Sequence, residues 1–291
     1  MKFYILALVL AVADAGLIFG DTNCVIIHNV NFEKEILKSD VQSPYQLAID
    51  HDTNTLFFSY TARTDEMFKI AYLSLKTGDF GIVSGIHGGF ATAIDRMSHV
   101  IYMGGDDGIY RFDYDNKDAT NLHINENSNI WQMFYKNALY FTTYPEEKAY
   151  VYKSKKLYEI ADLLNVKVML IAVNRQDNLV YTNSSGVFLY SKTDGSTIQL
   201  NNGVANGITA DIEGNLYFST ASAIYSIDDK TNAVERLARL ENTYGMAIDN
   251  AGNIIYATED SIIRLKPSRK VCIDDKLFSK SVDEVSASFH T

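Results

Sequence analysis

Six segments of the sequence repeat one pattern, an apolar stretch followed by a tight polar turn and a second apolar stretch. They are "YQLAIDHDTNTLFFSY", "FATAIDRMSHVIYMGG", "WQMFYKNALYFTTY", "MLIAVNRQDNLVYTNS", "NGITADIEGNLYFSTA" and "YGMAIDNAGNIIYATE". They recur about every 40 residues, the length of one four-stranded blade of a β-propeller. A third alternating stretch such as "GVFLYSK" follows each pair, and usually a fourth such as "AVERLARLE". We therefore predict an all-β fold, a six-bladed β-propeller.

The first stretch of each repeat ends in a polar residue: Asp50, Asp95, Tyr135, Asn174, Asp211 and Asp249. Asp and Asn side chains hydrogen bond to the backbone of tight turns, and Asn, Asp or Gly accepts the positive φ that such turns need. Residues of that kind follow at Asn54, Asp177-Asn178, Gly214-Asn215 and Gly252-Asn253. We interpret the repeated carboxylates as turn-forming residues rather than catalytic groups.

The sixth repeat lacks a fourth strand, and a matching segment stands at the other end of the chain. Residues 32–40, "FEKEILKSD", are similar to "VERLARLEN" of the fifth repeat. If this strand completes blade six, the ring closes by pairing the two ends of the chain, which removes exposed sheet edges. Cys24 and Cys272 would then lie on one rim of that blade, so we predict that a disulfide between them locks the closure. The propeller is expected to span residues 16–273, followed by a loose tail at 274–291.

The N-terminal segment "MKFYILALVLAVADAG" has the features of a secretory signal peptide: one Lys, a short apolar run and Ala13-x-Ala15. We predict a signal peptide over residues 1–15 and secretion into an oxidising compartment, where an isolated cysteine pair forms a disulfide. No later apolar run is long enough for a membrane helix, so a soluble mature protein without membrane contact is expected. We also expect a monomer. Asn183 begins the single N-x-S/T sequon and is a candidate glycosylation site.

Charge and motifs exclude several classes of function. The formal net charge of −10 argues against nucleic-acid binding, which needs a concentrated Lys/Arg patch; the short run of Lys153, Lys155 and Lys156 is interpreted as solvated surface. Neither G-x-S-x-G, H-E-x-x-H, a P-loop nor C-x-x-C occurs, and the six histidines lack metal-ligand spacing. We expect a protein without catalytic residues, cofactor or metal.

Ligands of propellers usually bind at the channel mouth where the inner strands begin. The residues predicted there are aromatic or soft, with a few polar groups, and flat π faces and thioethers suit a planar conjugated ligand. The alternative is that these side chains fill the channel as core packing. The predicted ligand-binding residues are Tyr45, Gln46, Arg63, His87, Phe90, Trp131, Gln132, Met169, Asn206, Tyr244 and Met246.

The stretch "ANGITADIEGNLYFST" resembles the regucalcin and gluconolactonase propellers. This resemblance implies a divalent metal at the mouth, bound by a Glu, an Asn and an Asp, that activates water against a lactone. By position the Asn is Asn206, whereas Gln42 replaces the Glu and Tyr244 replaces the Asp. Because a hard cation needs anionic oxygen ligands, the metal site is expected to be dismantled. A hydrolase that uses Asp106, Asp107 or Glu259 as unconventional ligands stays open as the alternative.

Segments such as "PYQLAIDHDTNTLFFSY", "GGFATAIDRMSHVIYMGG" and "GIYRFDYDNK" look like those of the ommochrome-binding proteins of moths. The resemblance runs through nearly the whole mature chain. It implies a secreted hemolymph protein that carries a small aromatic pigment of the phenoxazinone type, held at the channel mouth. Two other functions stay open: a secreted lactonase-like or esterase-like hydrolase, and a propeller that binds another protein through one face.

Overall fold

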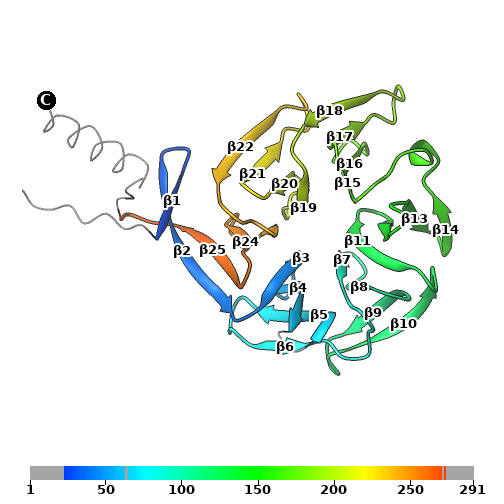
Figure 1. Cartoon of the computed structure of the whole chain (residues 1–291), viewed down its shortest axis with the longest axis horizontal. Helices are drawn as coiled ribbons and strands as arrows, with labels where there is room; N and C mark the ends of the chain where they lie inside the picture. The colour runs from blue at the N-terminus through cyan, green and yellow to red at the C-terminus, as the bar shows by residue number, and fades with distance from the viewer. Residues whose placement is uncertain (1–22, 63–64, 271, 273–291) are drawn as a thin grey trace, which may run out of the picture.

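A computed structural model describes residues 23–62, 65–270 and 272, which form six antiparallel sheets arranged as blades around a central axis (Figure 1). The predicted all-β, six-bladed β-propeller is confirmed. The predicted signal peptide, the predicted tail at 274–291 and Arg63 lie outside the described residues. No helix in the described ranges is long and apolar enough to cross a membrane.

The strands of the first five blades follow the chain from the inner strand outward. Blade one holds β3 (Gln42–Asp50), β4 (Thr55–Ala62), β5 (Asp65–Ser74) and β6 (Phe80–Ile82). Blade two holds β7 (Ala91–Asp95), β8 (Val100–Gly105), β9 (Gly108–Asp113) and β10 (Asp118–Ile124). Blade three holds β11 (Asn129–Tyr135), β12 (Leu139–Tyr144), β13 (Ala149–Lys153) and β14 (Lys156–Glu159), and the short 3-10 helix η1 (Ala161–Leu163) follows it. Blade four holds β15 (Leu170–Val173), β16 (Leu179–Asn183), β17 (Gly186–Tyr190) and β18 (Thr197–Asn201); blade five holds β19 (Ala205–Ala210), β20 (Leu216–Thr220), β21 (Ala223–Ile227) and β22 (Val234–Arg239).

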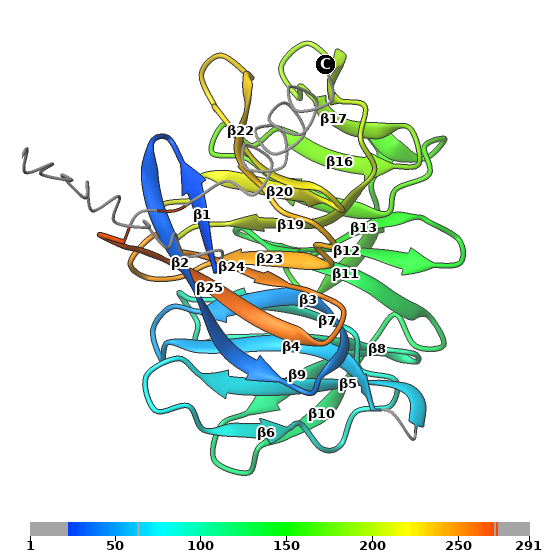
Figure 2. The same ribbon diagram turned by 60° about the vertical axis from the view of Figure 1, so that its left-hand side comes forward.

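Blade six combines the two ends of the described chain. Its inner strands are β23 (Gly245–Ile248), β24 (Ile254–Ala257) and β25 (Ser261–Pro267), and β2 (Val30–Ser39) pairs with β25 from Phe32 opposite Pro267 to Ser39 opposite Ser261. The predicted closure is therefore confirmed. A further strand that the sequence did not predict, β1 (Cys24–Ile27), pairs with β2, and Figure 2 shows this hairpin beside β25.

Covalent and ionic contacts reinforce this closure. The predicted disulfide joins Cys24 to Cys272, with the two Cα atoms 5.8 Å apart. The carboxylate of Glu35 on β2 bridges two cations of β25, at 2.7 Å from Arg264 Nε and 2.8 Å from Lys266 Nζ. The paired chain ends are thus held by backbone hydrogen bonds, an ion-pair network and one covalent bond.

The polar residues that end the inner strands form the turns, as predicted. Asp211 Oδ1 accepts hydrogen bonds from the backbone N–H groups of Glu213 and Asn215, and its Oδ2 accepts from the Asn215 amide and the Tyr217 hydroxyl. The turn residues named from the sequence, Asn54, Asp177, Gly214 and Gly252, all have positive φ. Blade three differs, because the Tyr135 hydroxyl forms a hydrogen bond with Asp95 of the neighbouring blade two. Burial and this contact raise the pKa of Tyr135.

Apolar side chains fill the space between neighbouring blades. Phe57 and Phe58 are adjacent on β4 and both fully buried, yet Phe57 packs among blade-two residues and Phe58 among blade-six residues. Successive strand residues point to opposite faces of a sheet, so each blade buries both faces. Burial of one such Phe side chain stabilises the fold by about 2–3 kcal/mol.

Candidate ligand-binding site

A row of aromatic rings crosses the mouth where the inner strands begin. Tyr244 of blade six lies 5.1 Å from Tyr45 of blade one, measured between ring centroids, and Tyr45 lies 6.2 Å from Phe90 at the start of blade two. The Phe90 ring lies 4.6 Å from Trp131 of blade three, which lies 5.1 Å from Tyr144. Four blades therefore contribute to one continuous aromatic surface, called here the aromatic row.

Irregular pairing at the start of the inner strands positions this surface. On β11 the register shifts between Ile130 and Gln132, which leaves Trp131 as the extra residue of a β-bulge. On β3 the register shifts on both sides of Tyr45. Since a bulge re-aims a side chain out of the regular alternation, these irregularities direct Trp131 and Tyr45 to the mouth.

The aromatic row is partly exposed and chemically neutral. Tyr45, Trp131 and Tyr244 are half-buried and Tyr144 is exposed, whereas Phe90 is 4% exposed. Burial, and to a lesser degree the neighbouring Tyr244, raises the pKa of Tyr45, so its phenol stays protonated. The row offers ring faces and hydroxyl groups but no charge.

Two aromatic residues, one beside the row and one at its end, were not among the predicted ligand-binding residues. Phe68 on β5 lies 4.6 Å from Phe90 and 6.5 Å from Tyr45, and Tyr144 ends β12 beside Trp131. Both flank connections between the second and third strands of a blade. Aromatic residues beside those connections were the sequence signal that could have identified them.

Two predicted ligand-binding residues are core residues instead. Met246 is 1% exposed and packs with Ile224 and Leu265 between blades five and six, because it lies within the regular pairing of β23, opposite Tyr256. Gln132 is 2% exposed: its Nε2 donates to the Met133 carbonyl at 2.9 Å and its Oε1 accepts from the Ile171 N–H at 2.9 Å. Gln132 thus ties blade three to blade four, and neither side chain is free to meet a ligand at the mouth.

The remaining predicted residues lie around the row or outside it. Met169 is half-buried and packs against the same cluster as Trp131, and Gln46 lines the central channel with a φ of 51°. His87 is exposed, with its Nδ1 3.4 Å from Asp106 Oδ2. Asn183 is partly exposed, and its Oδ1 accepts from the Ser185 N–H at 2.8 Å. Glycosylation of Asn183 stays a prediction.

Asn206 places an unpartnered acceptor beside the mouth. It is the extra residue of a bulge on β19, where the register shifts between Ala205 and Gly207. Its Nδ2 donates to the Thr243 carbonyl, whereas its buried Oδ1 has no hydrogen-bond partner among the described residues. The hydroxyls of Thr243 and Ser219 are likewise buried and unpartnered in the described structure. An unpaired buried polar group costs about 1–3 kcal/mol, so these atoms favour a bound donor or water.

The donor set at the mouth does not fit a hard cation. The positions of the three metal ligands in gluconolactonase-like propellers hold the amides of Gln42 and Asn206 and the phenol of Tyr244, without a carboxylate. Within the described ranges, no three His, Cys, Asp or Glu residues gather in metal-binding geometry. Of the alternative ligands, Asp107 accepts the Tyr110 hydroxyl at 2.7 Å, and burial raises the pKa of Asp106 although His87 opposes it.

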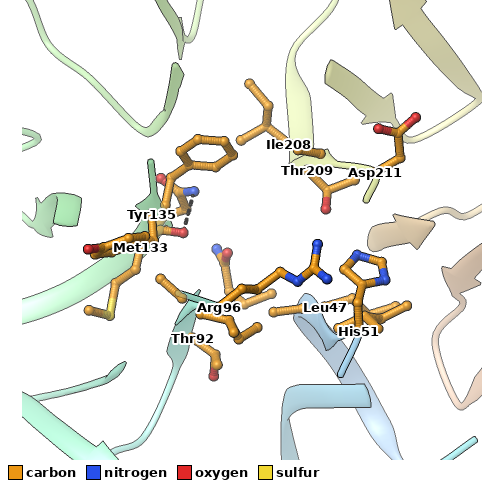
Figure 3. Close-up of a pocket in the computed structure, with 17 residues that line it drawn as sticks. Leu47, His51, Thr92, Arg96, Met133, Tyr135, Ile208, Thr209 and Asp211 are labelled. Carbon is orange, nitrogen blue, oxygen red and sulfur yellow. Dashed lines mark hydrogen bonds between the residues drawn. The ribbon is translucent and has the colours of Figure 1, made fainter. Parts of the chain in front are cut away.

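A hollow of about 130 Å³ occupies the central channel, below the mouth (Figure 3). It runs from Gln46 and Thr92 to the ends of the inner strands at Tyr135 and Asp211. Arg96 and His51 extend toward its middle, and Arg96 Nη2 lies 2.9 Å from Asp52 Oδ1. This volume holds a few water molecules but is below the 300–1,000 Å³ typical of ligand pockets.

Solved structures share the fold of this chain. A gluconolactonase from Xanthomonas campestris superposes with a TM-score of 0.65 at 14% identity, covering 84% of this chain and 92% of that one. A streptogramin B lyase superposes with a TM-score of 0.53 at 17% identity, covering 81% and 98%. Two different activities on one architecture, at such low identity, establish the fold alone.

The sequence comparison identifies a closer relative. No protein-family model matches the chain. The ommochrome-binding protein of Manduca sexta is 38% identical over 255 residues, which cover 85% of this chain and 92% of the relative. Identity at this level, along nearly the full length of the relative, establishes common descent as well as a common fold. This chain therefore belongs to the family of ommochrome-binding proteins.

Proposed function

We propose that this protein binds a planar aromatic pigment of the ommochrome, phenoxazinone type, at the aromatic row. The observation that carries the proposal is the continuous contact from Tyr244 through Tyr45 and Phe90 to Trp131. Half-buried rings at a channel mouth offer a fused ring system flat faces to stack on, and each such contact contributes about 0.5–1.5 kcal/mol. The name of the Manduca sexta relative supports the same class of ligand.

Polar atoms beside the row would orient the pigment. The unpartnered Oδ1 of Asn206 accepts a hydrogen bond, and the Thr243 and Ser219 hydroxyls accept or donate one. An amine or hydroxyl on the ligand edge would satisfy these groups. Because Gln132 of blade three is buried in the core, the polar groups proposed for the site are those of blade five and of the residues that precede blade six.

The proposed role is binding and transport without catalysis. Amides and a phenol at the three metal-ligand positions do not supply the anionic charge that lactone hydrolysis by a bound cation requires. We further propose that the protein is a secreted hemolymph monomer. The signal-like N-terminal sequence and the disulfide at the ring closure support the extracellular compartment.

The test uses Trp131, the single tryptophan of the chain. Titration with xanthommatin should quench its fluorescence saturably at about one ligand per chain, because a pigment stacked on the row lies within a few ångströms of the indole. Tyr244→Ala should weaken binding about three- to tenfold, the loss of roughly one stacking contact. Phe90 is buried, so Phe90→Leu is the better test at that position than Phe90→Ala.

Tyr158 provides the matched control. It is an exposed tyrosine on β14, at the outer edge of blade three. Tyr158→Ala should leave both quenching and affinity unchanged. Unaltered Trp131 emission on titration, or an equal loss of affinity in the Tyr158 and Tyr244 variants, would show that the pigment does not bind at the aromatic row.

A further inference from the structure

A second hollow, of about 400 Å³, lies between blades two and three. It is bordered by the turn that joins β11 to β12 and the turn that joins β13 to β14. These turns lie at the opposite ends of the strands from the aromatic row, so this groove opens on the other face of the ring. Its volume is within the range of small-molecule sites.

Tyrosine rings form one wall of the groove. Tyr102 and Tyr135 lie with ring centroids 6.0 Å apart and an angle of 14° between their planes, and Tyr152 lines the same hollow. All three are half-buried and pack against the cluster that contains Ile109 and Leu139. The wall is thus aromatic and held in place by the core.

The charged residues that line the groove are all cationic. They are Arg111, Lys153 and Lys155, all three exposed, and none forms an ion pair with any residue that the structure describes. The chain has a formal net charge of −10, so its overall electrostatic potential repels anions. The three cations make the potential of this groove locally positive.

The carboxylates that interact electrostatically with groove residues each form hydrogen bonds or an ion pair elsewhere. Asp95 accepts the Ser98 N–H at 3.2 Å and the Tyr135 hydroxyl. Asp113 accepts hydrogen bonds from two backbone N–H groups of its own turn. These bonds, and to a lesser degree the charge of Arg111, lower the pKa of Asp113. Asp177, which is influenced by Lys153, lies 2.8 Å from Lys136. The three groove cations therefore stay available to an anion.

Two departures from the repeat pattern meet in this groove. Tyr135 stands where the other blades carry Asp or Asn. The β13–β14 turn consists of Ser154 and Lys155, with φ angles of 51° and 61°, although such two-residue turns favour Asn and Gly. Blade three thus replaces turn-forming residues with an aromatic ring and a cation, and both line the hollow.

We propose that this groove binds a planar aromatic carboxylate, with its ring against the tyrosine wall and its carboxylate toward Arg111, Lys153 and Lys155. Aromatic faces supply stacking and the guanidinium and ammonium groups supply charge-assisted hydrogen bonds. The groove shares no residue with the aromatic row, so the proposal does not depend on the pigment function.

The experiment measures binding of 2-naphthoate by isothermal titration calorimetry, with the neutral 2-naphthamide as the uncharged analogue. Lys155→Gln should weaken naphthoate binding about three- to fivefold, the effect of one exposed charge pair, and Arg111→Gln combined with Lys155→Gln about tenfold or more. Naphthamide should bind at least about tenfold more weakly than naphthoate to the unmodified protein.

The control is Lys230→Gln, at an exposed lysine in the turn between the third and fourth strands of blade five, the counterpart of the Lys155 turn. It should leave naphthoate affinity unchanged. Equal effects of the Lys155 and Lys230 changes, equal binding of naphthamide, or absence of naphthoate binding would overturn the proposal. Loss of binding in Tyr244→Ala with retention in Lys155→Gln would place the aromatic acid at the mouth and overturn it too.

Discussion

The disulfide between Cys24 and Cys272 is expected to contribute a large share of the stability of this propeller. It joins residues 248 positions apart, so the unfolded chain loses the entropy of a very large loop when the bond is intact. The chain-entropy relation gives about 5.5 kcal/mol at 25 °C for a loop of this length. Residual structure in the unfolded chain reduces that figure, so Cys24→Ser should lower the free energy of unfolding by about 2–5 kcal/mol.

The assay is guanidinium denaturation followed by circular dichroism, in oxidising and in reducing buffer. Cys24→Ser, Cys272→Ser and the double variant should all lose the same free energy, because each removes the same bond. Added reductant should bring the unmodified protein to the level of the variants and leave the variants unchanged. For a domain of this size, a loss of 3 kcal/mol corresponds to a fall in Tm of about 6–12 °C. An unmodified protein whose denaturation midpoint is the same in both buffers would refute the reasoning.

Three further predictions address the turns, the closure and the mouth. Asp211→Ala should lower the free energy of unfolding by about 2–3 kcal/mol because it removes four hydrogen bonds. Glu213→Ala, in the same turn, should lower it by less than about 0.5 kcal/mol. Equal melting temperatures of these two variants would contradict a turn-forming role for Asp211. Partial burial raises the pKa of Glu35, but hydrogen bonds and charges from Arg264 and Lys266 outweigh it and hold the pKa below its ordinary value, so its contribution is present above that value and is lost as pH falls. Glu35→Gln should therefore reduce the loss of unfolding free energy as the pH is lowered, whereas the control variant Glu213→Gln should keep that loss. The same dependence of unfolding free energy on acidic pH in both variants would contradict this. Finally, Gln42→Glu combined with Tyr244→Asp should raise calcium affinity in calorimetry by supplying two carboxylates, and tight calcium binding with lactone hydrolysis by the unmodified protein would contradict the binding role.

The sequence predicted the fold well because its signals are local and repeated. Turn residues such as Asp211 and Gly214 act on their own hairpin, and their recurrence fixes the number of blades. The pairing of β2 with β25 was also predictable, because a missing strand at one end of the chain matched a surplus strand at the other. The strand β1 was not predicted, since its four residues carry too little pattern to stand out.

The candidate site was less predictable because β-bulges decide which side chains reach the mouth. Trp131 and Gln132 are neighbours on β11, and both were predicted to face the ligand. The bulge directs Trp131 to the mouth and leaves Gln132 in the core. This difference depends on one shift in backbone pairing, which the residue types do not predict. Met246 was misplaced for the opposite reason, because β23 is regular and keeps it between blades.

The closure of blade six also determines when the fold can form. The hairpin of β1 and β2 is synthesised before the other blade strands, whereas β25, the second partner of β2, follows only after nearly the whole chain has been made. Glu35 and Arg264, which face each other across the pairing of β2 with β25, are 229 positions apart. Blades one to five can form from sequential hairpins as they emerge, but each early assembly exposes an unpaired edge until β25 arrives. A translation product that stops before β25 is therefore an open arc with unpaired strand edges. These edges can form β-sheet pairs with the edges of other incomplete copies.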